Sequence, residues 1–303
     1  MTASAWTRRD FLTRVVVTGG LTIGGLAVSG GLLGSCTSIG GGGDSLERAK
    51  RSGTIKIGIA GEQPFGFIDR DGRATGEAPE VARAVFAALG VGNVQPVQVG
   101  FTSLIAGLVA GRYDVVAAGL PITPQRCSQA AFSIPDYQAF TAFLVPRGNP
   151  QLVNTFAEVT AGDVRIGVIS GTVQREYARE AGVPAEQIRP FETLETMLQA
   201  VRGRRVYCAA STDILLKDLL RRHPDPEVEV TAGFNPLLRG KEQITAGGFA
   251  FRKDDGDLRE SFNSELARIH GNGEWLRIAE PFGFTEVNHP APGVTTERLC
   301  SPT

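Results

Sequence analysis

From Arg51 onward, apolar runs typical of strands alternate with amphipathic stretches typical of helices, and this alternation most constrains the fold. TIKIGIA (54–60) alternates apolar and polar residues and predicts a strand. GEAPEVARAVFAALG (76–90) has a proline near its start and a glycine at its end, which predicts a helix. VQPVQVG and YDVVAAG read as further strands, with FTSLIAGLVAGR as the helix between them. Strands interleaved with helices predict an α/β protein with mainly parallel sheets.

The alternation breaks once and then restarts, which predicts two lobes. TAFLVPRGNP (141–150) is extended and ends in a proline-bounded turn, and VRIGVISG (164–171) begins a second series of strands and helices. We therefore expect one lobe from residues 51–145 and 250–303, and another from residues 146–249. Extended connections between them predict a hinge beside a cleft. Ligands of such sheets bind at the carboxyl ends of the strands.

The N-terminus has the pattern of an export signal. Arg8 and Arg9 precede Phe11 and a weakly apolar, glycine-rich run, and this resembles a twin-arginine signal. The run ends in LGSC, which resembles a bacterial lipobox and marks Cys36 for lipidation. We expect a signal over residues 1–36, a flexible tether over 37–50, and an extracytoplasmic protein held at the cell membrane by its lipid. An ordinary membrane span is the alternative, and the glycines disfavour it.

The net charge and the cysteines limit which partners, disulfides and metals we expect. A net charge of -1 over 303 residues does not favour a nucleic-acid partner. Cys208 lies in the apolar run VYCAAS and is expected to be a buried thiol, whereas Cys127 and Cys300 have polar neighbours and are expected to form a disulfide. No cluster of metal ligands stands out, so we expect neither a metal nor a cofactor.

The polar and aromatic residues that follow the predicted strands suggest a site for a zwitterion. Arg126 offers a planar fork of donors suited to a carboxylate. Phe65 and Phe101, with the acidic Glu62, suit a delocalised cation. As alternatives, Arg126 could lie on the surface and cap its helix, the phenylalanines could be core, and Glu62 could cap a turn. The candidate ligand-binding residues are Glu62, Phe65, Phe101, Gly119, Pro121, Thr123, Arg126, Thr172 and Thr212.

Several of these segments together resemble a known family. GEQPFGF, TGEAPEVARAVF, FTSLIAGLVAGRYDVVAAG, TPQRC, RIGVISGT and FRKDD resemble the periplasmic solute-binding proteins of polar amino-acid ABC transporters. GEAPEVARAV, ITPQRC, GNP, EPFGFTE and TTERLC more narrowly resemble the subunits that bind ectoine and hydroxyectoine. The resemblance implies a two-lobed type II binding-protein fold, with two mixed sheets and a two-strand hinge. It also implies a permease and an ATPase as partners.

The resemblance also implies which residues form the site. In the ectoine-binding subfamily an acid, three aromatic residues and an arginine surround the ligand, and these positions fall on Glu62, Phe65, Phe101, Pro121 and Arg126. Pro121 stands where the third aromatic is expected, which leaves the aromatic box open on one side. Thr212 stands where amino-acid binders carry an aspartate for the α-amino group. This departure favours a ligand without a primary amine.

Three other functions remain open at this point, one of them a sensor or partner protein that has kept the fold and lost transport. The chain could bind a polar amino acid, or it could be an exported enzyme on the same fold, such as a cyclohexadienyl dehydratase. An enzyme needs a positioned acid and base. We expect His223, His270 and His289 to lie away from the cleft, and we therefore expect a binding protein that is not an enzyme.

Overall fold

The computed structural model describes residues 45–301. The expected signal, the lipidation site Cys36 and the first part of the expected tether lie outside the described residues. Within residues 45–301, no helix is long and apolar enough to cross a bilayer. The described chain forms two mixed sheets flanked by helices, which confirms the expected two-lobed α/β fold.

The sheet of the first lobe has the strand order β4-β1-β5-β15-β6, and β7 also pairs with β15. β1 runs parallel to both β4 and β5, whereas β15 is antiparallel to β5. The strands are β1 (Thr54–Ile59), β4 (Asn93–Gln98), β5 (Val115–Pro121), β6 (Ala131–Phe132), β7 (Tyr137–Ala139) and β15 (Thr245–Phe251).

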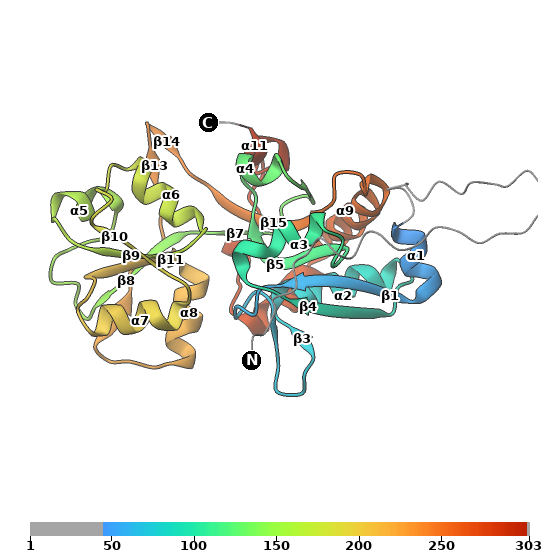
Figure 1. Cartoon of the computed structure of the whole chain (residues 1–303), viewed down its shortest axis with the longest axis horizontal. Coiled ribbons are helices and arrows are strands. Elements are labelled where there is room, and N and C mark those ends of the chain that lie inside the picture. Colours follow the sequence, from blue (N-terminus) through green and yellow to red (C-terminus); the bar gives the residue numbers. More distant parts are fainter. Residues whose placement is uncertain (1–44, 302–303) are drawn as a thin grey trace, which may run out of the picture. The chain divides into compact units, whose positions relative to one another are not determined.

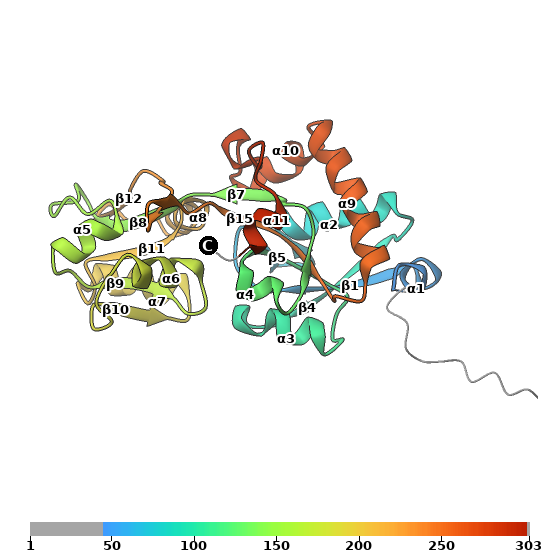
Figure 2. The same cartoon turned by 90° about the horizontal axis from the view of Figure 1, so that it is seen from above.

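Helices cover both faces of this sheet because successive residues of its strands point to opposite sides. Val115 and Ala117 join one hydrophobic cluster, and Val116 and Ala118 join another. The first cluster is covered by α1 (Ser45–Ser52), α2 (Glu77–Ala88), α9 (Gly256–Gly271) and α10 (Glu274–Ala279). The second is covered by α3 (Leu104–Val109), α4 (Pro124–Cys127) and α11 (Thr296–Cys300). Figure 2 shows α11 beside α4.

The sheet of the second lobe has the order β10-β9-β11-β8-β12. Its strands are β8 (Thr141–Pro146), β9 (Ile166–Ile169), β10 (Ile188–Phe191), β11 (Cys208–Thr212) and β12 (Val228–Val230). Ala142 and Leu144 pack on one face, and Phe143 and Val145 pack on the other. Figure 1 shows these faces covered by two pairs of helices: α7 (Leu194–Arg202) with α8 (Asp213–Arg222), and α5 (Phe156–Ala161) with α6 (Val173–Glu180).

Short elements complete the described chain. Two small hairpins pair β2 with β3 and β13 with β14. The remaining bounds are β2 (Phe67–Ile68), β3 (Ala74–Thr75), β13 (Leu237–Leu238), β14 (Lys241–Glu242), and the 3-10 helices η2 (Phe101–Ser103), η3 (Glu280–Phe282) and η4 (Glu286–Asn288).

The chain crosses between the lobes at places that differ from the expected boundaries of 145/146 and 249/250. β8 is not a crossover, since it pairs with β11 and β12 inside the second sheet and is buried along most of its length. β15 belongs wholly to the first sheet. The crossings therefore lie between Ala139 and Thr141 and between Glu242 and Thr245. An extended apolar run has the same appearance in a sequence whether it links two sheets or belongs to one.

The expected tether over residues 37–50 is also wrong in its last part, because α1 begins at Ser45. Leu46 and Ala49 lie three residues apart on one helix face and are buried in the first-lobe core. The hydroxyl of Ser45 donates a 2.5 Å hydrogen bond to the carboxylate of Asp255. Packing on the folded domain therefore orders this short helix, which local propensity alone would not stabilise.

Cys127 and Cys300 form a disulfide with their Cα atoms 5.6 Å apart, the pairing expected from the sequence. The bond joins the C-terminal helix α11 to α4. Cys208 is a buried free thiol, also as expected, and burial raises the pKa of this thiol.

A buried acid lies in the first-lobe core. Glu77 is fully buried, and burial together with the neighbouring carboxylate of Asp136 raises the pKa of Glu77 well above its ordinary value. Trp275 Nε1 donates a 3.0 Å hydrogen bond to Asp136. The folded protein therefore favours the neutral form of Glu77 above the ordinary pKa of a glutamate.

The stability of the protein should consequently fall as the pH rises. The unfolded chain releases the proton of Glu77 near its ordinary pKa, whereas the folded chain retains it, so unfolding becomes easier above that pKa. Glu77→Gln should remove this dependence. The unfolding temperature of the variant, relative to that of the wild type, should therefore rise as the pH increases from 5 to 8. Thermal denaturation across this range tests the effect. A constant difference between the two proteins would contradict it.

Candidate functional site

The candidate residues follow strand ends in both sheets. Glu62 and Phe101 come after β1 and β4, and Arg126 comes after β5, all in the first lobe. Thr172 follows β9, and Thr212 ends β11, both in the second lobe. These positions agree with the rule that open α/β sheets bind ligands beyond the carboxyl ends of their strands.

A cavity of about 520 Å³ lies between the two sets of strand ends. From the first lobe it is lined by Gly61, Glu62, Gln63, Phe101 and Thr102, among others. From the second lobe it is lined by Ser170, Glu192, Thr193, Glu195 and Arg222, among others. A cavity of this size can enclose a small solute. Of the nine predicted ligand-binding residues, Glu62 and Phe101 line it directly.

Arg126 does not line this cavity, but it contacts Phe101, which does, and it connects the two lobes by a hydrogen bond to Gly171. Its Nη1 donates to the carbonyl of Pro121 at 2.7 Å, and its Nη2 donates to the carbonyl of Gly171, in the second lobe, at 2.9 Å. The guanidinium carbon lies 5.4 Å from the ring centroid of Phe101, a cation–π contact. Burial lowers the pKa of Arg126 to about 10, so the side chain is still charged at neutral pH. The fork thus faces the other lobe rather than bulk water.

Gly171 permits the close approach of the lobes at this point. Its φ of +75° lies in the left-handed region, and an added Cβ would come 2.9 Å from Cγ2 of Thr102 in the first lobe. A side chain at this position would push the lobes apart and lengthen the bond from Arg126. The glycine is therefore part of the geometry that presents the guanidinium.

Glu62 is the second charged group at the strand ends. Burial raises the pKa of Glu62 to about 7, and the negative charge of Glu195 in the second lobe adds to the rise. Backbone hydrogen bonds between Gly66 and both Gly61 and Glu62 hold the surrounding loop in a tight turn. A cation placed near Glu62 would lower the pKa of this carboxyl and so favour its ionised form.

Phe65 lies in the core rather than on the cavity wall. It is 3% exposed, and its ring packs 4.8 Å from that of Tyr137 and 5.4 Å from that of Phe284, centroid to centroid. Gly119 has a φ of +58°, and a Cβ there would lie 2.1 Å from the Phe65 ring. Gly119 thus makes room for Phe65, and the pair forms the support behind the site.

The threonines and Pro121 serve mainly as local supports. Thr123 Oγ1 accepts a hydrogen bond from the amide of Arg126 and caps the N-terminus of α4. Thr212 Oγ1 accepts one from the amide of Leu215 and caps the N-terminus of α8. The hydroxyl of Thr172 donates to the carbonyl of Ile169. Pro121 is buried at the end of β5, and its carbonyl holds Arg126.

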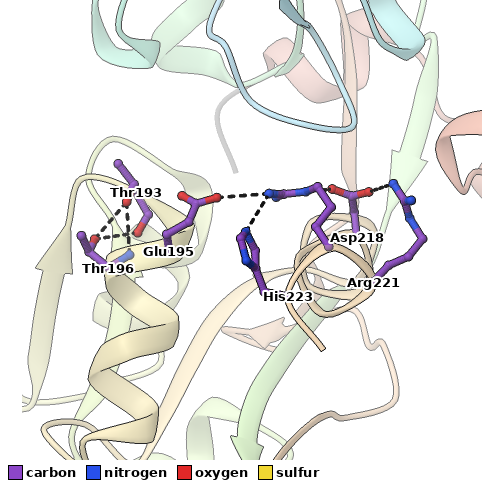
Figure 3. Close-up of polar contacts among 7 residues, drawn as sticks. Thr193, Glu195, Thr196, Asp218, Arg221 and His223 are labelled. Carbon is purple, nitrogen blue, oxygen red and sulfur yellow. Dashed lines mark hydrogen bonds and ion pairs between the residues drawn. The ribbon is translucent and has the colours of Figure 1, made fainter. Parts of the chain in front are cut away.

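Sequence reasoning missed the acidic groups of the second lobe. Glu192 follows β10, and Glu195 lies in the first turn of α7, where Figure 3 shows it near Asp218 and His223 of the α8 region. β10 was not recognised because its sequence, IRPF, is short and contains a proline. The available signal was FETLE, with two acids just before an amphipathic helix.

Arg222, the basic residue lining the cavity, is held by acids on its own lobe. Its Nε donates to Asp218 at 2.7 Å, and its Nη1 lies 3.3 Å from both Glu195 Oε1 and His223 Nε2. His223 therefore lies beside the cavity lining, contrary to the expectation that all three histidines are remote. The carboxylate of Asp218 is also bound by Arg221.

The fold and the inter-lobe cavity define a solute-binding protein. Residues 55–285 match the model of the bacterial extracellular solute-binding proteins, family 3, and the chain belongs to this family. A probable amino-acid ABC transporter periplasmic-binding protein of Sinorhizobium fredii is 33% identical over 85% of this chain and 86% of its own. The L-cystine-binding protein TcyJ of Escherichia coli K12 is 26% identical over 80% of this chain and 87% of its own.

A solved structure is similar over almost its whole length. The crystal structure of EhuB in complex with hydroxyectoine has a TM-score of 0.76 and 34% sequence identity, and the match covers 86% of this chain and 99% of EhuB. The two curated relatives are solute-binding proteins, and the EhuB structure contains a bound solute. Both findings agree with the cleft described above.

The raised pKa of Glu62 can be measured directly. We expect its carboxyl carbon to titrate with a midpoint of about 7 in a ¹³C NMR experiment on the ligand-free protein. Because the folded state favours the neutral form, this group should stabilise the fold less as the pH rises from its ordinary pKa toward 7. Glu62→Gln provides the resonance assignment. A midpoint at the ordinary value of a glutamate would show that the carboxyl is solvated.

Proposed function

We propose that this chain captures a small zwitterion of the ectoine class between its lobes and delivers it to the permease and ATPase of an ABC importer. The observation that carries this proposal is the placement of Arg126, whose half-buried guanidinium lies over the Phe101 ring of the cavity lining and bonds to both lobes. A ligand carboxylate that accepts from this fork would join the lobes in the same way as the carbonyl of Gly171 does.

The anionic end of the ligand is assigned to Arg126 on the basis of its donors. A guanidinium has five N–H donors, and the carbonyls of Pro121 and Gly171 take up one each. The remaining donors can pair with a carboxylate, and charge-assisted bonds of this kind are among the strongest that a binding site offers. The Phe101 ring, which contacts the guanidinium and also lines the cavity, provides an apolar surface for the body of the ligand.

The cationic end is assigned to the acidic side of the cavity. Glu62 and Glu195 come from opposite lobes, and the negative charge of Glu195 contributes to the raised pKa of Glu62. Two carboxylates near one cavity disfavour each other until a cation lies between them. A ligand with a delocalised positive charge would relieve this repulsion as the lobes close.

The similarity to EhuB supports the ligand class, because the crystal structure of EhuB holds hydroxyectoine. Pro121 remains a departure from the residues expected for that subfamily. Its buried position at the end of β5 leaves the cavity with Phe101 as its aromatic wall, and weaker binding of ectoine than in a complete aromatic box is the consequence.

A polar amino acid is the second candidate, and the related L-cystine-binding protein favours it. Amino-acid binding by this fold would be expected to use an acid near Thr212 for the α-amino group. The nearby Asp213 is already engaged, since it accepts from the amide of Phe140 at 3.1 Å and from Lys217 Nζ at 2.9 Å. This arrangement favours the ligand without a primary amine.

Binding is also a better proposal than catalysis. The ionisable side chains in the cavity lining of the described chain are Glu62, Glu192, Glu195 and Arg222. Glu62 could donate a proton, but catalysis of an elimination would also require a base in contact with the same substrate. The acids and Arg222 are instead arranged as paired or mutually repelling charges suited to holding a charged solute.

We also propose that the protein works outside the cytoplasmic membrane, exported by a twin-arginine signal and anchored through a lipid on Cys36. The sequence pattern of residues 7–36 supports both steps. The folded domain begins at Ser45, so about eight residues would separate the lipid from the first helix.

Isothermal titration calorimetry tests the ligand class. We expect binding of ectoine and hydroxyectoine, with weaker or no binding of glycine betaine, arginine and cystine. Arg126→Ala should weaken binding by about 30-fold or more, since truncating one partner of a buried charged pair costs ~2 kcal/mol or more. Circular dichroism should show that the variant is folded.

Two results would contradict the proposal. Strong binding of an α-amino acid without binding of ectoines would make the chain an amino-acid receptor. Retained affinity in Arg126→Ala would show that the guanidinium does not hold the ligand.

The role of Glu195 can be tested separately from that of Arg126. Glu195→Gln keeps the shape of the side chain but removes its charge, so hydroxyectoine should bind about threefold to tenfold more weakly. Glu186→Gln is the matched control, because Glu186 is an exposed acid of the same lobe that does not line the cavity. Equal effects of the two changes would show that only the overall charge of the lobe matters.

A further inference from the structure

The last segment of the described chain, which we name the C-terminal strap (residues 286–300), contacts parts of the first lobe that are far apart in the sequence. It follows the core helices α9 and α10 and begins directly after the family match, which ends at residue 285. The strap contains η4 and α11 and includes Cys300. The strap therefore lies beyond the residues that the family model matches.

One end of the strap is bound to the hinge strand β7. Gln138, in the middle of β7, makes three hydrogen bonds to the strap through both its side chain and its backbone. Its Nε2 donates to the carbonyl of Val287 at 2.8 Å, its carbonyl accepts from Asn288 Nδ2 at 3.2 Å, and its Oε1 accepts from the amide of Ala291 at 3.1 Å. β7 leads directly into the crossing to the second lobe.

The other end is bound to the segment that carries Arg126. The hydroxyl of Thr296 donates to the carbonyl of Ser133 at 2.7 Å, and Cys300 forms the disulfide with Cys127, the residue after Arg126. Leu299 and Cys300 pack on the same hydrophobic cluster as Phe101. The strap thus contacts the supports of both side chains that make the cation–π pair.

α4 needs such support because it is a single turn. It spans Pro124–Cys127, and its backbone is held by the cap from Thr123, a few backbone bonds and side-chain bonds from the residues that follow. A helix of this length is not stable by itself. A covalent bond at Cys127 restricts the turn next to the side chain that crosses to Gly171.

We propose that the C-terminal strap is a positioning element that holds Arg126 and Phe101 in their binding geometry and ties them to the hinge strand β7, with the Cys127–Cys300 disulfide as its fastening. This inference rests on the proposed function in taking Arg126 as the ligand anchor. Cys127, Cys300, Thr296 and Gln138 act through Arg126 and Phe101 without contact to the ligand.

The first test is a double-mutant cycle on the full chain with hydroxyectoine. The double change Cys127→Ser and Cys300→Ser should weaken binding about fivefold to tenfold, the cost of ordering one or two free side chains on binding. In an Arg126→Lys background, which retains a charge but lacks the fork, the same double change should cost almost nothing further. Cys208→Ala is the control cysteine variant and should leave the affinity unchanged.

Loss of stability alone would give a different result, namely an equal loss of affinity in both backgrounds, and this would overturn the proposal. Thr296→Val keeps the disulfide and the size of the side chain but removes the bond to Ser133. If the serine variant does not fold, Thr296→Val takes its place in the cycle, with the same expectation and a smaller effect.

The second test needs no ligand and therefore separates this inference from the proposed function. Hydrogen exchange of the ligand-free protein should become faster at the amides of residues 126–130 in the serine variant, while the amides of β8 and β9 in the second lobe keep their rates. Unchanged hydrogen exchange in α4 would overturn the proposed positioning role of the strap. Absence of hydroxyectoine binding by the wild type would overturn the proposed ligand only.

Discussion

A half-buried guanidinium needs acceptors for its donors, and in this protein that need is met from both lobes. Arg126 satisfies it with one carbonyl from its own lobe and one from the turn after β9 in the other. The Phe101 ring beneath it and the small Gly171 opposite it allow the side chain to reach across.

Opposite charges surround the same cavity without neutralising each other. Arg126 lies over the Phe101 ring of the lining, while Glu62, Glu192 and Glu195 lie along the lining, and Arg222 compensates only part of the negative charge because Asp218 also holds it. A molecule with separated charges of both signs can satisfy both regions at once. A neutral or singly charged molecule would leave one of them desolvated and unpaired, which is costly. The proposed preference for a zwitterion rests on this separation of charges.

The alternation of strands and helices was enough to predict the two α/β sheets. Residue chemistry at strand ends pointed to Glu62 and Phe101, which line the cavity, and to Arg126, which contacts Phe101; their part in ligand binding stays a prediction. Cys127 and Cys300 could be paired because their neighbours are polar. The crossings were misplaced because β8 is as apolar as any central strand, and its partners are distant in sequence. Phe65 turned out to be core, since only the three-dimensional structure shows the rings of Tyr137 and Phe284 around it. Glu195 was missed because its partner across the cleft belongs to the other lobe.

The position of β15 in the first sheet has a consequence for the order in which the chain can fold during synthesis. The strands and helices of the second lobe lie in one continuous stretch between β8 and β12, so this lobe is complete as soon as that stretch has left the ribosome. β15 lies between β5 and β6, so the earlier sheet strands must wait for it with an open edge. The half of the protein that is translated first is thus the half that is finished last, and the edge of β5 stays unpaired in that interval.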